Sequence, residues 1–255
     1  MKHLISHIAY IISGILFLFS CLLSSCKEKE KVEPDIKLGL VSEYKLNVSE
    51  PSGLCRFRNS TEFLTVSDQT NKIYVVSETG TVLRNFDFTG EDLEGIAYDP
   101  GLNEVFVLEE TSRQVFILDT NSVEQSRFPV DIYYEDDKHG PEGISYDPET
   151  KHLFIVVEKN PGKLVEMNLN GEILNSYFLS FADDFSAIFF DSKDNKLWIL
   201  SDESKTLSRC DLTGKALNTY ETGIKKGEGL VVDPENKLVY IVSDLESKMY
   251  VLSIP

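Results

Sequence analysis

Three glutamates that stand directly before a glycine are the first candidates for chemistry in this chain. They lie in DLEGIAYDP (92–100), GPEGISYDP (140–148) and GEGLVVDP (227–234), and are Glu94, Glu142 and Glu228. Carboxylates that lie close together raise one another's pKa and destabilise the fold unless a cation or hydrogen-bond donors compensate their charge. Calcium takes about six to eight oxygen ligands, so we predict a calcium ion among these glutamates. The alternative is that they accept hydrogen bonds from backbone N–H groups, with water between them.

A second acidic residue stands sixteen positions after the second residue of each repeat unit defined below. The five are Asp68, Glu110, Glu158, Asp202 and Asp244. A strand, a turn and a returning strand fit into that interval, so we expect a possible second ring of ligands on the same rim. Asp68, Asp202 and Asp244 also allow a structural interpretation, in which each bonds the backbone two residues on. Lys72 and Lys248 would then pair with the aspartate four residues before them.

Zinc and other soft metals are not indicated by the cysteines and histidines. After residue 26 only His139, His152, Cys55 and Cys210 remain, and they show no ligand spacing. The two cysteines lie in different repeat units, and their number alone does not establish a bridge. We predict two free thiols that behave as small buried side chains.

The glutamate motifs belong to a repeat that runs through the chain. Five units begin at Pro51, Leu93, Pro141, Phe185 and Gly227, with steps of 42, 48, 44 and 42 residues. A period in the forties is typical of propeller blades and of helical-pair repeats. Within each unit, short β-branched and aromatic runs alternate with turns, and no window has a helical apolar face. The units are therefore expected to be blades of three or four antiparallel strands.

These units predict an all-β protein, a five-bladed β-propeller closed by an N-terminal strand. The fifth unit ends after its third strand, and LGLVSEYKL (38–46) can supply the fourth. This closure leaves no open sheet edge. The glycine after each glutamate is expected to allow close packing near the axis, and the Asp-Pro to close the hairpin at the far end. The 48-residue step contains the longest connection between blades (129–143), which could form a binding lip on the rim of Glu142 or a solvated acidic loop.

The composition disfavours one class of partner. The chain is 42% hydrophobic and 26% charged, as soluble globular proteins are, with a formal net charge of −17. Residues 1–25 contain one lysine and no acid, so the remainder has 24 basic and 42 acidic residues, a charge of −18. Such a surface repels phosphate backbones, so we expect no nucleic-acid partner.

The N-terminus is typical of a targeting signal, because Lys2 precedes an apolar stretch (8–25). LSSC (23–26) resembles the lipobox of bacterial lipoproteins, which implies a lipoprotein signal peptide at 1–25 and lipidation of Cys26. Cys21 is a competing site with bulkier neighbours, and an uncleaved membrane anchor is the alternative. We predict a lipid-anchored membrane protein of the bacterial cell envelope, without assigning it to a membrane leaflet. Residues 26–37 would be a charged tether and 38–255 the β-propeller domain.

The motifs DLEGIAYDP, GPEGISYDPETKHLFIVVEK and GEGLVVDPENKLVYIVSD resemble the SdiA-regulated (YjiK/CarP-like) β-propeller family of bacterial envelopes, over roughly 40–255. That family is similar to esterase-like phytases and, more distantly, to NHL-repeat and lactonase propellers. The resemblance implies a calcium-linked propeller, with Glu94, Glu142 and Glu228 as metal contacts. Ser52 and Ser186 replace the glutamate in two blades and depart from the pattern.

Three functions remain open. The first is a binding or sensing module, with a monomeric domain, that holds calcium and an unknown small-molecule or protein ligand. The second is a calcium-dependent hydrolase, phosphoesterase/phytase-like or lactonase-like, in which the metal polarises the substrate. Its basic candidates are Arg113, Lys159 and Lys163, and no Gly-x-Ser-x-Gly motif is present. The third is a metal-free protein-interaction scaffold, and the catalytic residues of any enzyme among these stay unknown.

Overall fold

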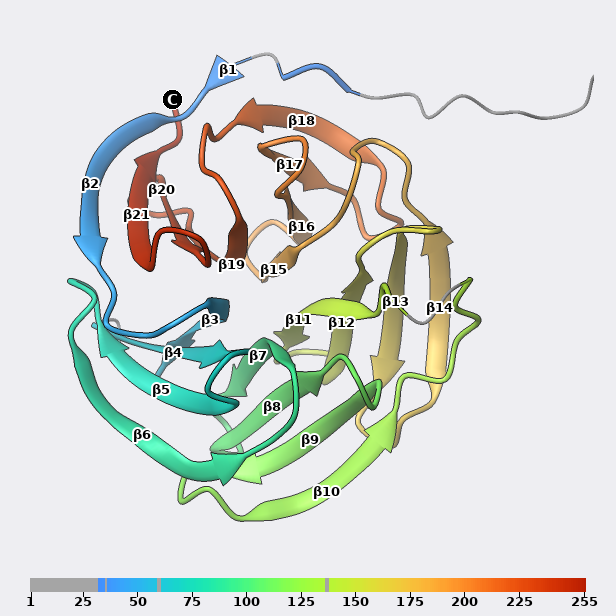
Figure 1. Cartoon of the computed structure of the whole chain (residues 1–255). Coiled ribbons are helices and arrows are strands. Elements are labelled where there is room, and N and C mark those ends of the chain that lie inside the picture. Colours follow the sequence, from blue (N-terminus) through green and yellow to red (C-terminus); the bar gives the residue numbers. More distant parts are fainter. Residues whose placement is uncertain (1–31, 35, 59–60, 136–137) are drawn as a thin grey trace, which may run out of the picture. The chain divides into compact units, whose positions relative to one another are not determined.

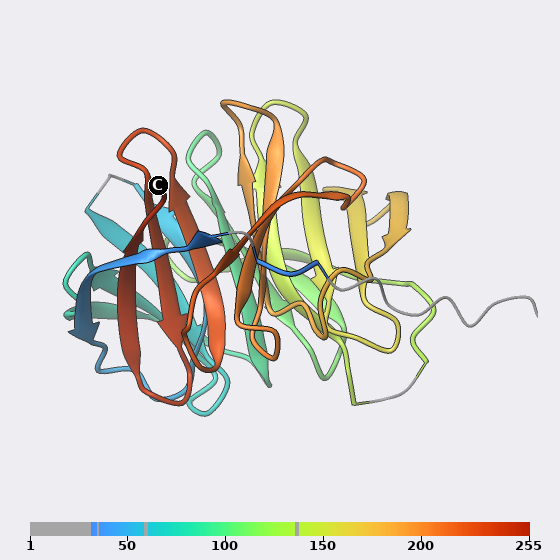
Figure 2. The same ribbon diagram turned by 90° about the horizontal axis from the view of Figure 1, so that it is seen from above.

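The regular structure of this protein consists of strands arranged in a ring of five sheets (Figures 1 and 2). The computed structural model describes residues 32–34, 36–58, 61–135 and 138–255, and within these ranges there are 21 strands. Each sheet has its first strand near the centre of the ring and its last at the periphery (Figure 1). The predicted all-β, five-bladed β-propeller is confirmed.

The blades follow the repeat units. Blade 1 comprises β3 (Pro51–Phe57), β4 (Glu62–Ser67), β5 (Lys72–Ser77) and β6 (Val82–Thr89). Blade 2 comprises β7 (Leu93–Asp99), β8 (Glu104–Glu109), β9 (Gln114–Asp119) and β10 (Glu124–Pro129). Blade 3 comprises β11 (Pro141–Asp147), β12 (His152–Val157), β13 (Lys163–Asn168) and β14 (Ile173–Phe178). Blade 4 comprises β15 (Ala187–Asp191), β16 (Lys196–Ser201), β17 (Thr206–Cys210) and β18 (Ala216–Glu221). Blade 5 comprises β19 (Gly227–Asp233), β20 (Leu238–Ser243), β21 (Lys248–Ser253) and β2 (Gly39–Lys45).

The ring is closed by the N-terminal strand, as the sequence predicts. β2 pairs antiparallel with β21, from Gly39 opposite Ser253 to Lys45 opposite Lys248. A short strand before it, β1 (Ile36–Lys37), pairs in parallel with β18 of blade 4. Residues 36–37 were predicted as the end of the tether, and they instead belong to the sheet. The chain therefore crosses blade 4 before it completes blade 5.

The predicted signal peptide and the lipidation site Cys26 lie outside the described residues. Among the residues that the structure describes, no helix is long and apolar enough to span a membrane.

Hydrophobic side chains fill the five interfaces between neighbouring blades. Five clusters of buried residues are present in the described part of the chain, and each joins two adjacent blades. Between blades 2 and 3, for example, Phe106 packs with Leu153 and Ile155, and all three are almost fully buried. Inner strands are therefore covered on both faces, which explains their near-continuous apolar runs.

The glycine after each glutamate brings the inner strands of neighbouring blades together, as predicted. A Cβ on Gly95 would lie 2.9 Å from Ile144 Cγ2 and 3.0 Å from the carbonyl oxygen of Glu142, both in blade 3. A Cβ on Gly229 would lie 2.6 Å from the carbonyl carbon of Gly53, in blade 1. Such contacts are too short for any side chain. Glycine is required here because the strands converge on the axis.

The Asp-Pro motifs close the inner hairpins at the opposite end of the channel. The carboxylate of Asp99 accepts the N–H of Gly101 at 2.7 Å, and that of Asp147 accepts the N–H of Glu149 at 2.9 Å. Asp191 has no proline after it, but it forms the same bond with Lys193 at 3.0 Å. These aspartates therefore stabilise turns, as predicted for the far end.

Candidate functional site

The three glutamates meet at one end of the channel, which we call the acidic mouth. Each is the second residue of an inner strand. Glu94 of β7, Glu142 of β11 and Glu228 of β19 therefore lie at the same rim. They line a cavity of about 140 Å³. Its lining is almost entirely polar and consists of Ser52, Asp68, Glu94, Glu142, Glu158, Asp184, Ser186, Lys226, Glu228 and Asp244. The cavity lining thus contains seven carboxylates and one ammonium group.

The second acidic set divides into two groups. Asp68, Glu158 and Asp244 line the cavity with the glutamates. Glu110 and Asp202 do not line it: Glu110 forms a cluster with Asp92 and with Glu94 of the cavity, and Asp202 pairs with Lys226. The sequence therefore placed both sets on one rim correctly, but their members have different neighbours.

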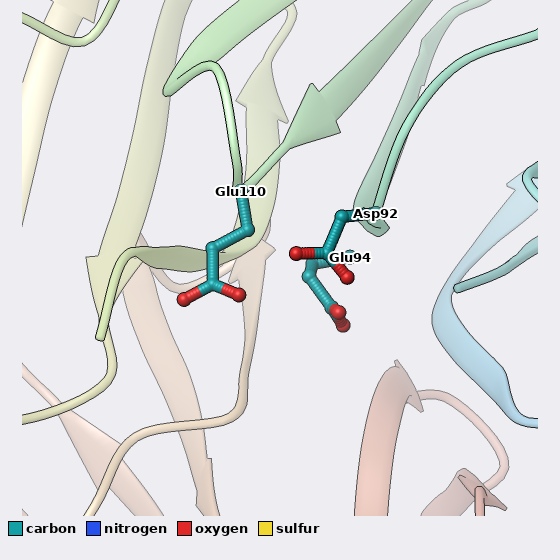
Figure 3. A group of neighbouring side chains, drawn as sticks. All are labelled: Asp92, Glu94 and Glu110. Atoms are coloured by element: carbon teal, nitrogen blue, oxygen red, sulfur yellow. The ribbon is translucent and has the colours of Figure 1, made fainter. Parts of the chain in front are cut away.

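One cluster at the mouth brings carboxylates within reach of a single cation. Asp92, Glu94 and Glu110 each offer one oxygen, and these oxygens lie within 4.8 Å of one another. Figure 3 shows Asp92 directly before β7, Glu94 on β7 and Glu110 just after β8, with their side chains extending into a shared space. In the described part of the chain, Glu142 and Glu228 do not form a comparable group with Glu94.

Hydrogen bonds position two carboxylates of this cluster, those of Asp92 and Glu110. The Thr111 hydroxyl donates to Asp92 Oδ2 at 2.9 Å, and the Gly140 N–H donates to Glu110 Oε1 at 2.6 Å. Ser52 of blade 1 lines the same cavity as Glu94. Each bond leaves further oxygen lone pairs for a cation, and donors of this kind orient the ligands of metal sites.

Two lysines neutralise the other side of the mouth. Lys226 Nζ lies 3.4 Å from Asp202 Oδ2 and 3.4 Å from Glu228 Oε1. Lys159 Nζ lies 2.8 Å from both Glu158 Oε1 and Glu203 Oε1. No lysine or arginine forms an ion pair with Asp92, Glu94 or Glu110 in the part of the chain that is described. These ion pairs therefore compensate carboxylates of blades 3, 4 and 5, and none of blade 2.

Burial and mutual repulsion set the protonation of these groups. Burial raises the pKa of Glu94 and of Glu142 well above the ordinary value, and neighbouring carboxylates raise it further. Burial likewise raises the pKa of Glu110 to about 7 and that of Asp68 to about 6. It raises the pKa of Glu228 to about 8, against the opposing effect of Lys226. A divalent cation would stabilise the charged forms.

The structural interpretation of Asp68, Asp202 and Asp244 is wrong in its details, although the Asp68 carboxylate does accept a backbone N–H, that of Gln69 one residue on, at 2.6 Å. The turn after each second strand is capped by the serine one residue earlier: Ser67, Ser201 and Ser243 accept the N–H groups of Thr70, Ser204 and Glu246. Because side chains alternate along a strand, a serine facing the turn leaves the next aspartate facing the mouth. Lys248 pairs with Glu43 at 3.0 Å and not with Asp244.

The long connection between blades 2 and 3 lies beside the mouth, as predicted. Its Gly140 contacts Glu110, and the His139 imidazole Nε2 lies 3.8 Å from Glu158 Oε2. Tyr134 packs into the core between the blades, and the Arg113 guanidinium lies 3.9 Å from the centre of its ring. The described part of this loop is thus anchored against the rim.

Carboxylates at the mouth that were missed from the sequence include Asp92 and Asp184. Asp92 stands directly before β7, and Asp184 takes the same place in the unit of blade 4. Asp184 is 3% exposed, and its carboxylate accepts hydrogen bonds from the Ser201 hydroxyl and the Glu203 N–H. The signal was the position itself, since the residue before an inner strand stands at the mouth in every blade.

The thiols are free, as predicted, but only one of them is buried. Cys55 and Cys210 are both free, with Cys210 buried and Cys55 partly buried.

The comparisons with known proteins agree with this fold. The family model described as SdiA-regulated matches residues 33–253. The chain belongs to the SdiA-regulated family. The predicted resemblance is therefore confirmed over nearly the whole propeller. A solved structure with a similar fold is the β-propeller domain of Cps50 (Swd1) from Myceliophteria thermophila. It is 10% identical, has a TM-score of 0.51, and the match covers 84% of this chain and 100% of that chain. This likeness concerns the fold alone.

Proposed function

We propose that this member of the SdiA-regulated family is a lipid-anchored binding module of the bacterial cell envelope that holds a calcium ion at its acidic mouth. The observation that carries the proposal is the cluster of Asp92, Glu94 and Glu110. Oxygen ligands lie about 2.3–2.6 Å from Ca²⁺, so two ligands of one ion are at most about 5 Å apart. Oxygens within 4.8 Å of one another fit that limit. The Glu142 carboxylate, from the neighbouring blade, lies outside this group but interacts electrostatically with Glu94 and Glu110.

The charge of the cavity supports a cation rather than an anionic substrate. Seven carboxylates and one ammonium group line it. The basic residues that a phosphoesterase would need have other contacts: Lys159 pairs with two glutamates, Lys163 donates to the Tyr133 carbonyl, and Arg113 stacks on Tyr134. Enzymes acting on phosphate esters normally surround the phosphate with positive charge.

The size of the cavity favours an ion with water over an organic ligand. Pockets for organic ligands usually enclose about 300–1,000 Å³. The cavity at the mouth encloses about 140 Å³. We propose that any small-molecule or protein partner binds over the occupied mouth, where the described residues of the connection between blades 2 and 3 (130–135 and 138–140) form one border. The envelope location rests on the lipobox-like LSSC and on the apolar stretch before it.

Calcium titration by calorimetry tests this function on the chain from residue 27 onward, after removal of metal by a chelator. We expect binding of one ion in the micromolar-to-millimolar range, about that of extracellular calcium modules or tighter. Glu94→Gln and Glu110→Gln should weaken binding by about tenfold or more, because each removes a charged ligand of similar shape. Glu149→Gln, in a hairpin at the opposite end of the channel, is the matched control. Absence of binding at millimolar calcium would leave the metal-free scaffold as the better function.

A further inference from the structure

The residue directly before the inner strand occupies the same structural position in blades 2, 3 and 5, which we call the entry position. In three blades its carbonyl oxygen accepts the N–H of the acidic residue after the second strand: Asp92 from Glu110, Gly140 from Glu158, and Lys226 from Asp244. Asp92 and Lys226 also share a left-handed backbone, with φ of 62° and 48°. The two side chains therefore leave equivalent backbones at the same rim.

Blade 5 repeats the acidic cluster of blade 2 with one change of charge. Blade 2 has Asp92 at the entry position, Glu94 on the inner strand and Glu110 after the second strand. The equivalent residues of blade 5 are Lys226, Glu228 and Asp244. A cationic side chain thus stands where blade 2 has an anionic ligand.

The ammonium group of Lys226 lies where a cation would be held by blades 4 and 5. It is 3.4 Å from both Glu228 and Asp202, whose side chains are only 12% and 11% exposed. Asp184 and Asp244 line the same cavity. The lysine side chain itself is 53% exposed, so it reaches inward from the rim to place its charge between the two carboxylates.

We propose that Lys226 is a built-in cation that fills a second cation position of the mouth and confines the divalent ion to the side of blade 2. The second position would take a hard divalent cation once the ammonium group is removed, because its remaining donors are carboxylates. The inference rests on the proposed function for the blade 2 site, but the second position can be tested separately.

Substitution of Lys226 by aspartate tests the inference most directly. Asp92 already adopts the same left-handed backbone at the equivalent position, so Lys226→Asp introduces no new strain. We expect the stoichiometry of calcium binding, measured by calorimetry and equilibrium dialysis, to rise from one to two ions per chain. Lys226→Asn also tolerates this backbone. It should show a second ion bound at least about tenfold more weakly, because it removes the ammonium without adding a ligand.

Lys248→Asp is the matched control for charge. It makes the same change of charge on β21, where Lys248 pairs with Glu43 at the outer strand. It should leave one ion per chain, and thermal melts of all variants verify folding. If Lys226→Asp or, should that variant not fold, Lys226→Asn binds the same number of ions as the unmodified chain, the inference is overturned.

The outcomes for the two proposals are distinguishable. An unmodified chain that binds no ion, together with a Lys226→Asp variant that binds one, would reject the blade 2 site and support the second position. One ion in both chains, lost in Glu110→Gln, would support the blade 2 site and reject the role of Lys226. No ion in any variant would reject both.

Discussion

At the scale of single residues, the carboxylates of the acidic mouth lose hydration when the chain folds, and few of them gain a positive partner. Burial raises the pKa of Glu110 to about 7 and of Glu228 to about 8. The unfolded chain titrates such groups near pH 4.5. The native protein therefore binds more protons than the unfolded chain between about pH 4.5 and 8.

The free energy of unfolding should consequently fall as pH rises through this window. The contribution of these groups is fully present below about pH 4.5 and is lost as pH passes the native pKa values. Without metal, we expect the melting temperature to be highest near pH 5 and to decrease towards pH 8. Calorimetric scans at constant ionic strength with a chelator measure this.

Two further scans test whether these carboxylates cause the decrease in melting temperature. Calcium should remove most of the decrease, because it stabilises the charged carboxylates. The double variant Glu110→Gln, Glu228→Gln should show a flatter dependence on pH. Asp119 and Asp211 do not interfere, since hydrogen bonding leaves their pKa lowered, so they titrate below the window. A melting temperature that rises from pH 6 to 8 without metal would contradict the assignment.

At the scale of elements, the inner strands are held by backbone contact between blades. Gly143 has no room for a side chain: a Cβ there would lie 2.9 Å from Ala187 Cα and 2.9 Å from Ile188 N, both in β15. The two strands can approach only because glycine stands at this place. The same approach positions Glu142 beside the glutamates of the neighbouring blades.

Gly143→Ala should therefore destabilise the domain by about 1–3 kcal/mol, because backbone cannot move aside as a flexible side chain can. The midpoint of urea unfolding measures this change. Gly101→Ala is the matched control, since a Cβ there would meet only the Asp99 side chain, at 3.1 Å. It should change stability by no more than about 0.5 kcal/mol. Equal midpoints for the two variants would show that the inner strands are not held in contact by glycine.

At the scale of the whole molecule, the ring depends on one strand from the far end of the sequence. β2 supplies the outer strand of blade 5 and pairs with β21 along its length. Leu38 and Leu46, which flank β2, are 3% and 1% exposed. Without this segment, β21 would have an open edge and the interface between blades 5 and 1 would lose part of its core.

Two truncations test the closure. A chain that begins at Leu38 loses β1 but keeps β2, and we expect a stable monomer. A chain that begins at Asn47 loses both, and we expect a melting temperature lower by about 10 °C or more, or aggregation through the open edge. Size-exclusion chromatography and thermal melts distinguish these outcomes. If the shorter chain stayed monomeric with an unchanged melting temperature, closure by β2 would not be what stabilises the ring.

The sequence alone determined the strands, the five blades, their closure and the rim that receives the glutamates. Those features depend on local patterns: the spacing of the repeat, the alternation of apolar residues and the chemistry of the turns. Even the close approach at Gly95 and Gly229 was predictable, because glycine recurs at that place. These features are determined within each repeat unit, so they do not depend on the exact placement of the unit in the ring.

The tertiary structure decided which carboxylates share a neighbour. Glu94 and Glu228 stand at the same position in their units. Glu94 lies in a cluster with Asp92 and Glu110, whereas Glu228 forms an ion pair with Lys226. Distances of a few ångströms between side chains from different strands and blades depend on how the blades pack, and no spacing along one chain contains that information. The repeat therefore placed an acidic ring at the mouth, and only the packing of the blades separated a candidate cation cluster from its neutralised counterpart.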